Sequence, residues 1–361
     1  MKIGNVALPS PMVVSPMAGM TDTAFRRLVK RQGGCGLVVT EMVSSDGLVR
    51  GIDRTLEYAE YTEEERPVSI QIFGGDPDKM AEAARIVEGM GANIVDVNMG
   101  CPVAKISKHN AGCRLMREPR HAATIIAAMV NAVRIPVTVK MRKGWDDDEM
   151  NAEDVARRVE DAGAAAIAIH GRTAKQSYSG TADWEFVARV ADALTIPVFG
   201  SGDCIEPQQI VERLRHGVNG VFVGRGVLRN PWILAQAQDL LEGRPARAVS
   251  LEHRGRFLLD YIALLQAERL REESGFRHQA PGTSGEAAPR HDRWVINKVR
   301  ALCSWYTKGF DSGAKLRINI NAAQSLDELR GLIAAFFFPQ RNSAAATDDV
   351  DDFDALFPAA R

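Results

Sequence analysis

The sequence predicts a (β/α)8 TIM barrel followed by a small all-helical domain. Eight short apolar runs, rich in β-branched residues, recur over about 240 residues, which is typical of parallel strands covered by helices. Helical patterns separate most of these runs, and eight β/α units close a barrel. A doubly wound sheet is the competing fold, but no G-x-G-x-x-G motif follows the first strand.

The strands and helices alternate along the first two thirds of the chain. The predicted strands are Met12–Met17, Leu37–Met42, Val68–Gly74, Ile94–Met99, Val137–Arg142, Ala166–Gly171, Val198–Gly202 and Val221–Gly224. Apolar residues at helical spacing predict helices at 78–90, 120–133, 154–163, 184–194 and 207–217. Gly or Pro often marks the return from helix to strand, as at Gly91 and Gly163.

The pattern changes after residue 243, where strand signals stop. We therefore predict a barrel at 1–243, a helical domain at 244–341 and an acidic, flexible tail at 342–361. Within the second part, helices are predicted at 253–273, 292–308 and 325–338. The stretch 277–292 is rich in Gly and Pro, looks like a local insertion and suggests no function.

The composition is that of an ordinary globular enzyme. The chain has 361 residues and a net charge of -1, so only a local basic patch would attract nucleic acid. Five cysteines without paired spacing argue against a disulfide framework and favour a reducing compartment. Neither a signal peptide nor an apolar run of about 18 residues is found, so we expect a cytoplasmic protein without a membrane span. The sequence implies neither a metal site nor an obligate protein partner.

Polar residues stand where the predicted strands end. In a TIM barrel these ends face the catalytic mouth. The residues include Gln71, Asn98, Cys101, Lys140, Arg142, His170 and Arg172. A lysine within an apolar strand needs an anionic or strongly accepting partner, so Lys140 indicates a ligand.

Glycines end the last two strands and indicate a phosphate site. Ser201-Gly202-Asp203 follows the seventh strand and Gly224-Arg225 follows the eighth. Such glycines let backbone N–H groups approach a ligand, and the loops after strands seven and eight commonly bind phosphate in this fold. Arg225 adds a charged fork for the same group.

A flavin suits the remaining groups at the mouth. Gln71 offers an amide to a pyrimidine edge, and Lys140 offers a cation near N1. Spacing alone does not establish a flavin. A Schiff-base Lys140, as in an aldolase, explains that residue but leaves Cys101 unexplained.

Cys101 lies between Gly100 and Pro102, directly after the fourth strand. A cysteine there is either a packed small residue or a working thiol. A free thiol has a pKa of about 8.5, so it is mostly protonated near pH 7 and can donate a proton.

Several motifs together resemble the tRNA-dihydrouridine synthases. They are SPMAGMTD at 15–22, VSIQIFG at 68–74, VDVNMGCP at 95–102, IHGRT at 169–173, SGD at 201–203 and VGRG at 223–226. The segments at 111–113 and 305–321 are similar to the bacterial B-type branch. The resemblance implies an FMN-dependent (β/α)8 barrel with a helical domain, with NADPH as reductant and tRNA as substrate.

The resemblance also implies residue roles. Reduced FMN passes hydride to C6 of a uracil in tRNA, a D-loop position such as U17, and Cys101 protonates C5. The implied FMN contacts are Pro16, Met17, Ala18, Gln71, Lys140, His170, Ser201, Gly202, Asp203, Gly224 and Arg225. Asn98 is implied to lie beside the flipped uracil. Ser201 departs from the family, which usually has Asn there.

Basic and aromatic residues in the helical domain predict contacts with RNA. The predicted tRNA contacts there are Arg293, Lys298 and Arg300, and Lys105 and Arg172 join them near the mouth. A solvated helix face with core aromatics is the alternative interpretation.

Two other functions remain open from the sequence. One is an FMN-dependent dehydrogenase or reductase of a free pyrimidine, against which the basic helical domain argues. The other is a non-catalytic RNA-binding protein built on a barrel, against which Cys101, Lys140 and His170 argue together.

Overall fold

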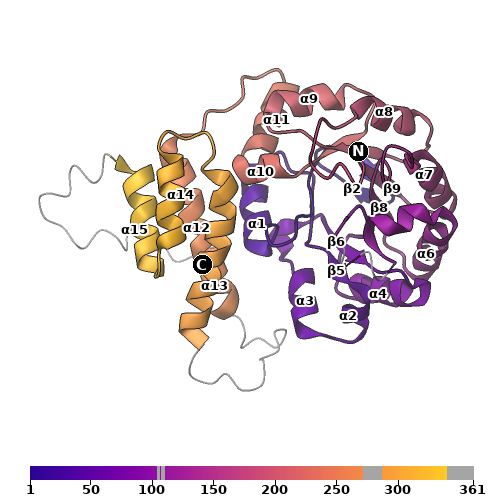
Figure 1. Cartoon of the computed structure of the whole chain (residues 1–361), viewed down its shortest axis with the longest axis horizontal. Coiled ribbons are helices and arrows are strands. Elements are labelled where there is room, and N and C mark those ends of the chain that lie inside the picture. The colour runs from indigo at the N-terminus through magenta and orange to yellow at the C-terminus, as the bar shows by residue number, and fades with distance from the viewer. Residues whose placement is uncertain (104–105, 107–109, 271–286, 340–361) are drawn as a thin grey trace, which may run out of the picture. The chain divides into compact units, whose positions relative to one another are not determined.

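A computed structural model describes residues 1–103, 106, 110–270 and 287–339 (Figure 1). Eight parallel strands form a closed barrel, with helices around its outside, and this confirms the predicted fold. The barrel strands are β3 (Met12–Val14), β4 (Leu37–Val39), β6 (Val68–Phe73), β7 (Ile94–Met99), β8 (Val137–Arg142), β9 (Ala166–His170), β10 (Val198–Ser201) and β11 (Gly220–Val223).

The strands follow one another around the barrel in chain order. The pairing of β11 with β3 and of β4 with β6 completes the circle. A two-residue strand, β5 (Val43–Ser44), pairs with the far end of β6. All pairings in this sheet are parallel, so every carboxyl end opens toward the same mouth.

The predicted barrel helices are present within a few residues of their expected ends. They are α4 (Pro77–Gly89), α6 (Pro119–Ala132), α7 (Ala152–Asp161), α8 (Trp184–Asp192) and α9 (Pro207–Leu214). Helices outside the predicted set are α1 (Thr23–Gln32), α2 (Ser45–Val49), α3 (Asp53–Ala59), α10 (Arg225–Arg229) and α11 (Ile233–Leu241).

An N-terminal hairpin closes the apolar end of the barrel. Its strands, β1 (Lys2–Ile3) and β2 (Val6–Ala7), are antiparallel. Ile3 joins one buried apolar cluster with Val13, Phe199 and Phe222 of the barrel strands. The interior beside the hairpin is therefore mostly apolar, although Ser69, Asp96 and Thr138 line the same small cavity as Ile3.

The helical part forms a second compact unit. Residues 1–247 belong to the barrel unit, and the described residues 248–270 and 287–339 belong to the helical unit. The helices of this unit are α12 (Leu251–Leu270), α13 (Ala287–Tyr306), α14 (Gly313–Ala322) and α15 (Leu326–Phe337). The predicted domain boundary at residue 243 stays a prediction.

An aromatic core holds the helical unit together. Tyr306 of α13 stacks on Phe257 of α12 at 5.6 Å between ring centroids, and its hydroxyl donates to the Arg254 carbonyl at 2.9 Å. Phe310 and Phe337 meet nearby, edge to face, at 5.9 Å.

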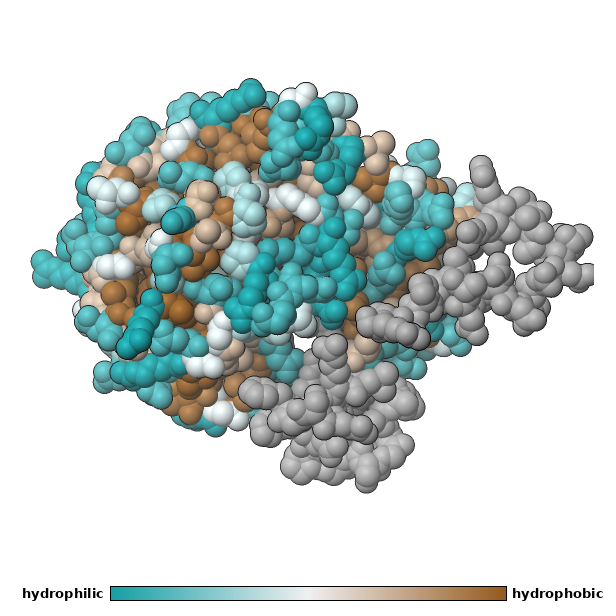
Figure 2. Space-filling view, turned by 180° about the vertical axis from the view of Figure 1, so that it is seen from behind, coloured by the Kyte–Doolittle hydropathy of each residue, from teal (hydrophilic) through white to brown (hydrophobic). Residues whose placement is uncertain are grey.

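The surface seen from behind is mostly hydrophilic, with smaller hydrophobic patches between the polar residues (Figure 2). Among the described residues, no helix combines the length and the apolar character that a membrane crossing requires.

Candidate active site

Five neighbouring strands, β6 to β10, bring the polar strand ends together. The register pairs Gln71 with Asp96, Asn98 with Lys140, Arg142 with His170, and His170 with Ser201. Side chains two residues apart on a strand share a face, so this pairing builds one continuous polar surface at the mouth.

A chain of hydrogen bonds runs through Gln71, which is 1% exposed. Its Nε2 donates to Oδ2 of Asp96 at 2.8 Å, and its Oε1 accepts from Nδ2 of Asn98 at 2.7 Å. Thr138 Oγ1 donates to the other carboxylate oxygen of Asp96 at 2.6 Å. The amide of Gln71 thus keeps one N–H and one lone pair for a ligand.

Asn98 and Gly112 fix the turn that carries Cys101. Oδ1 of Asn98 accepts from the backbone N–H groups of Gly100, at 3.1 Å, and Cys101, at 2.9 Å. On the opposite side, the N–H of Cys113 donates to the Cys101 carbonyl at 3.1 Å. Gly112 has φ +62°, and a Cβ there would lie 2.6 Å from the Cys101 carbonyl oxygen, so the turn requires glycine.

The Cys101 thiol suits an acid. Cys101 is partly exposed, whereas the other four cysteines are buried. Burial raises the pKa of Cys101, and the Val103 N–H and the Arg142 guanidinium oppose that shift without cancelling it. The thiol therefore stays protonated at neutral pH. Arg142 also donates from Nε to the Gly100 carbonyl at 2.8 Å.

Lys140 offers an uncommitted cation. Burial, followed by the charge of Arg142, lowers the pKa of Lys140 to about 8, although Asp96 opposes the shift. The ammonium group makes no hydrogen bond or ion pair with the described residues. It is therefore mostly charged at pH 7 and available to an anionic or accepting ligand.

His170 is neutral and oriented by Ser201. Its Nδ1 lies 3.3 Å from the Ser201 hydroxyl oxygen. Burial, together with the charges of Lys140, Arg142 and neighbouring arginines, lowers the pKa of His170 to about 2. Because the ring carries no charge at neutral pH, it acts as a hydrogen-bonding group rather than a cation. Although the family usually has Asn at this position, the hydroxyl of Ser201 can still form a hydrogen bond with His170.

Two arginines meet on Asp203 at the ends of β9 and β11. Arg172, which is 2% exposed, donates from Nη2 to both carboxylate oxygens of Asp203, at 2.8 and 2.7 Å. Arg225 lies 3.5 Å from the same carboxylate and stacks over Tyr178 at 4.6 Å. Arg172 also donates to the Ser179 and Gly180 carbonyls, so it holds the loop after β9. Its predicted tRNA contact stays a prediction.

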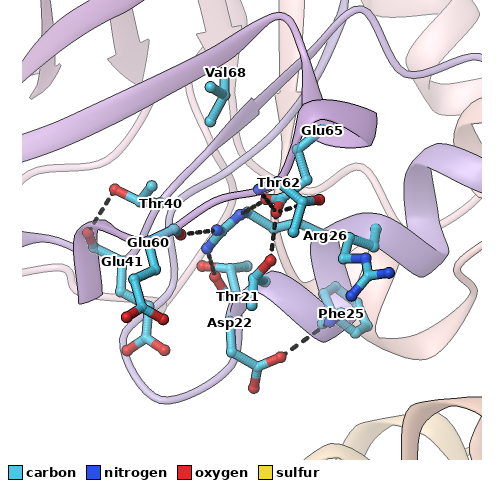
Figure 3. Close-up of polar contacts among 12 residues, drawn as sticks. Thr21, Asp22, Phe25, Arg26, Thr40, Glu41, Glu60, Thr62, Glu65 and Val68 are labelled. Carbon is cyan, nitrogen blue, oxygen red and sulfur yellow. Dashed lines mark hydrogen bonds and ion pairs between the residues drawn. The ribbon is translucent and has the colours of Figure 1, made fainter. Parts of the chain in front are cut away.

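The loop after β3, which contains Pro16, Met17 and Ala18, is fastened at both ends. Thr21 Oγ1 accepts from the Met17 N–H at 3.0 Å, and Glu41 Oε2 accepts from the Gly19 N–H at 2.5 Å. Asp22 then caps α1 by accepting from the Phe25 N–H at 3.0 Å (Figure 3).

A buried ion pair supports that loop through the Thr21 carbonyl. Arg26 and Glu65 are 1% and 0% exposed, and Nε of Arg26 donates to Oε2 of Glu65 at 2.6 Å (Figure 3). The other guanidinium nitrogens donate to the carbonyls of Thr21, at 2.6 Å, and Glu60, at 2.7 Å. The backbone of the loop is thus tied to a fully satisfied buried charge.

The residues present fit a flavin with a phosphate arm. Nε2 of His170 and Nη1 of Arg172 are buried, and neither has a hydrogen-bond partner among the described residues. A Cβ on Gly224 would lie 3.4 Å from Sδ of Met17, which is an ordinary contact, so Gly224 lies beside that loop. Together with the free ammonium of Lys140, these groups suit an anionic, ring-bearing ligand.

The helical unit pairs two cations with two tryptophans along α13 and just beyond its end at Tyr306. The ammonium of Lys298 lies 5.6 Å from the Trp294 ring centroid, and that of Lys308 lies 3.9 Å from the Trp305 centroid. We call these four residues the α13 stripe. Arg293 is exposed beside it.

The Arg300 guanidinium forms hydrogen bonds within the helical unit. It donates to the carbonyls of Ile320, at 3.3 Å, and Ala323, at 2.6 Å, at the end of α14. Its predicted tRNA contact stays a prediction. Lys105, most of the stretch 277–292 and the tail 342–361 lie outside the described residues.

Comparisons with known proteins decide the family. The model of the family described as "Dihydrouridine synthase (Dus)" matches residues 12–333. This chain belongs to the dihydrouridine synthase family. It is 36% identical over 339 residues to the "Probable tRNA-dihydrouridine synthase" of Rickettsia bellii, covering 93% of this chain and 97% of that one. It is also 36% identical to the "tRNA-dihydrouridine synthase B" of Xanthomonas axonopodis pv. citri, covering 93% and 96%.

A solved structure agrees on the fold. The complex described as "2-Naphthoyl-CoA Reductase-2-Naphthoyl-CoA complex(NCR-NCoA-soaked complex)" has a TM-score of 0.50 and 14% identity, and the match covers 68% of this chain and 52% of that one. At that identity it supports the barrel alone. The family resemblance drawn from the sequence motifs is confirmed, and the roles of the individual residues stay predictions.

Sequence reasoning missed Asp96 and Thr138 as parts of the site. The signal was present, because Asp96 alternates with Asn98 in the run Ile94–Met99 and must share its face. An acid inside an apolar strand is as informative as Lys140, which was noticed for that reason.

Proposed function

We propose that this member of the dihydrouridine synthase family reduces a uridine of tRNA to 5,6-dihydrouridine, using FMN and NADPH. The observation that supports it best is a protonated, partly exposed thiol, Cys101, held at the mouth beside a polar surface that suits a flavin. The names of the relatives point to the same substrate.

The FMN contacts proposed from the resemblance have a matching chemistry. When bound, FMN accepts hydride from NADPH and supplies it to C6 of the uracil ring. Lys140 neutralises negative charge on the ring system, and Gln71 holds its amide-like edge with the N–H and lone pair that remain free. Arg225, with the backbone at Gly202 and Gly224, binds the phosphate arm. Neutral His170 donates or accepts one hydrogen bond from Nε2.

Cys101 supplies the proton. The uridine must leave the stack to reach a barrel mouth, which costs a few kcal/mol and less in a folded loop. Asn98 then lies beside the extruded base. As C6 gains hydride, the electron pair of the C5–C6 double bond takes the proton from Sγ of Cys101 at C5. The thiolate left behind regains a proton from solvent before the next turnover.

The rest of the chain supports an RNA substrate rather than a free pyrimidine. The α13 stripe presents two cations on two indole rings, which suits phosphates and unstacked bases. A free pyrimidine needs no such surface. We further propose a D-loop position, such as U17, as the target, which is what the resemblance to the B-type branch implies.

Replacement of Cys101 tests the proposal. Cys101→Ala should bind FMN and be reduced by NADPH at the rate of the unchanged protein. Its formation of dihydrouridine in tRNA should fall by about 100-fold or more, because only the proton donor is lost. Single-turnover assays of flavin reduction and of dihydrouridine measure the two steps separately. Dihydrouridine formation at the normal rate would remove Cys101 from this role.

A further inference from the structure

We propose that Asp96 is a positioning residue for Cys101, acting through the side chains of Gln71 and Asn98. The inference rests on the proposed function only for what Cys101 does in turnover. The contacts that carry it are independent of that role.

The path between the two residues is continuous. Asp96 accepts from Nε2 of Gln71 at 2.8 Å, and Gln71 accepts from Nδ2 of Asn98 at 2.7 Å. Asn98 in turn accepts from the backbone N–H of Cys101 at 2.9 Å and of Gly100 at 3.1 Å. All the hydrogen bonds donate in one direction, from the Cys101 backbone toward Asp96. The orientation of each amide therefore determines which group its neighbour must present.

Chemistry fixes that direction from both ends. The N–H groups of Gly100 and Cys101 can only donate, so Asn98 must turn its oxygen toward them and its NH2 group toward Gln71. Gln71 then presents its oxygen to Asn98 and its NH2 group to Asp96. Only an acceptor at position 96 completes this order, and a carboxylate supplies one at Oδ2.

Packing alone does not explain an acid at this place. Asp96 is 3% exposed, and burial raises the pKa of its carboxyl group. It receives hydrogen bonds from Gln71 and Thr138 but forms no ion pair with the described residues. A buried carboxylate costs stability relative to an apolar side chain, and such exceptions concentrate at functional sites. We infer that the carboxylate of Asp96 is kept because it fixes the orientation of the Gln71 and Asn98 amides.

The consequence falls on the Cys101 turn. Three contacts hold it: Asn98 on the N–H groups of Gly100 and Cys101, Arg142 on the Gly100 carbonyl, and Cys113 on the Cys101 carbonyl. Asp96 governs the first of these. With Asn98 turned the wrong way, donors would face donors and the turn would shift the thiol.

An exchange of the acid and the amide tests the inference in the flavin-loaded protein. In Asn98→Asp, the new carboxylate still accepts from Cys101, but its second oxygen faces the oxygen of Gln71, and turning Gln71 only moves the clash to Asp96. In Asp96→Asn/Asn98→Asp, Asn at 96 donates to Gln71 and Gln71 donates to Asp at 98. Both variants place a carboxylate beside Cys101. Asn98→Asp adds one negative charge to the site, whereas the exchange variant keeps the total charge of the unchanged protein, so the exchange variant is compared with both proteins.

Two readouts measure that difference. The first is the rate of flavin reoxidation by tRNA after reduction by NADPH. The second is the rate and pH profile of Cys101 alkylation by iodoacetamide, which is selective because the other four cysteines are buried. We expect the exchange variant to exceed Asn98→Asp by about tenfold in reoxidation and to return the alkylation profile toward that of the unchanged protein. Equal values for the two variants would overturn the inference.

A second set of variants tests the same inference in case the first two variants do not fold. In Asp96→Asn, the new amide can keep its oxygen on Gln71 while Thr138 accepts its NH2 group, so we expect a small effect. Thr138→Val alone removes only the hydroxyl on the other carboxylate oxygen and serves as the matched control. Asp96→Asn/Thr138→Val removes the Thr138 acceptor from the new NH2 group and should lose about tenfold in reoxidation against either single change. Additive effects would overturn the inference. Full activity of Cys101→Ala would instead refute the proposed acid and leave the alkylation result to stand.

Discussion

At the scale of single residues, the mouth of the barrel separates charge from hydrogen bonding. Lys140 retains cationic character, whereas His170, surrounded by cations, is neutral with a pKa of about 2. Cys101 stays protonated because its pKa is raised. At pH 7, Cys101 and His170 are therefore neutral and most of Lys140 is charged, which suits a site that must deliver one proton and hold one anionic ligand.

The pKa of Lys140, about 8, predicts a pH dependence of FMN binding. The dissociation constant of FMN should rise by about tenfold from pH 7 to pH 9, because the cation that attracts FMN is lost as the pH rises through the pKa. Fluorescence titration of the apoprotein with FMN at several pH values measures it.

Lys140→Met is the control for that experiment. Lys140→Met should bind FMN more weakly at pH 7, and its dissociation constant for FMN should not rise between pH 7 and pH 9. Unfolding caused by Lys140 cannot explain weaker FMN binding at high pH. The pKa of Lys140 in the folded protein lies below its unfolded value near 10.4, so the folded state becomes more stable as the pH rises between these two pKa values. Pronounced pH dependence that persists in Lys140→Met would contradict the assignment.

At the scale of elements, the loops that carry the site are held by buried polar contacts. The turn at Cys101 is held by Asn98 and Arg142, and the loop after β3 by Thr21, Glu41 and the Arg26–Glu65 pair. Short strands leave these loops long, so side-chain contacts replace the hydrogen bonds that a sheet would supply.

Breaking the Arg26–Glu65 pair should be costly, and removing both charges less so. Arg26→Met or Glu65→Gln should lower the free energy of unfolding by about 3–5 kcal/mol, because each leaves a buried charge unpaired. The double variant should cost clearly less than the sum. Urea unfolding of the four proteins measures this cycle, with Arg85→Ala as an exposed-pair control that should change it by less than about 1 kcal/mol. Additive losses would show that the two side chains act separately.

The barrel could be predicted from the sequence because its strands are apolar runs whose number and spacing admit few folds. The site was predicted in part, where a residue type was out of place, as with Lys140 and Cys101. The side-chain contacts that support the site loops could not be predicted. Arg26 and Glu65, for example, lie 39 positions apart in the sequence and meet only in the folded chain. Arg300 likewise has partners that the sequence did not indicate, because its guanidinium donates to two carbonyls at the end of α14.

At the scale of the whole molecule, chemistry and RNA recognition are proposed for different units. The barrel unit holds the thiol and the flavin-compatible residues, and the helical unit holds the α13 stripe on an aromatic core. Loss of the stripe should therefore weaken the binding of tRNA without changing the chemistry at the mouth.

The α13 stripe gives a direct prediction. Trp294→Ala/Lys308→Ala should weaken the binding of tRNA by about tenfold or more and reduce its salt dependence, since one stacking platform and one phosphate contact are lost. The rate of flavin reduction by NADPH should not change. Lys79→Ala removes one exposed cation on the barrel helix α4, so it controls for net charge. Equal losses in both variants would show that the stripe has no specific role.

The most direct test of the central claim is anaerobic. The purified protein, reduced with NADPH, would be mixed with unmodified tRNA transcript or with free uridine while flavin reoxidation is followed. We predict rapid reoxidation by tRNA, with one dihydrouridine formed per flavin oxidised, and none by free uridine. Reoxidation by free uridine at a comparable rate, or a reduced flavin that tRNA leaves unchanged, would contradict the account.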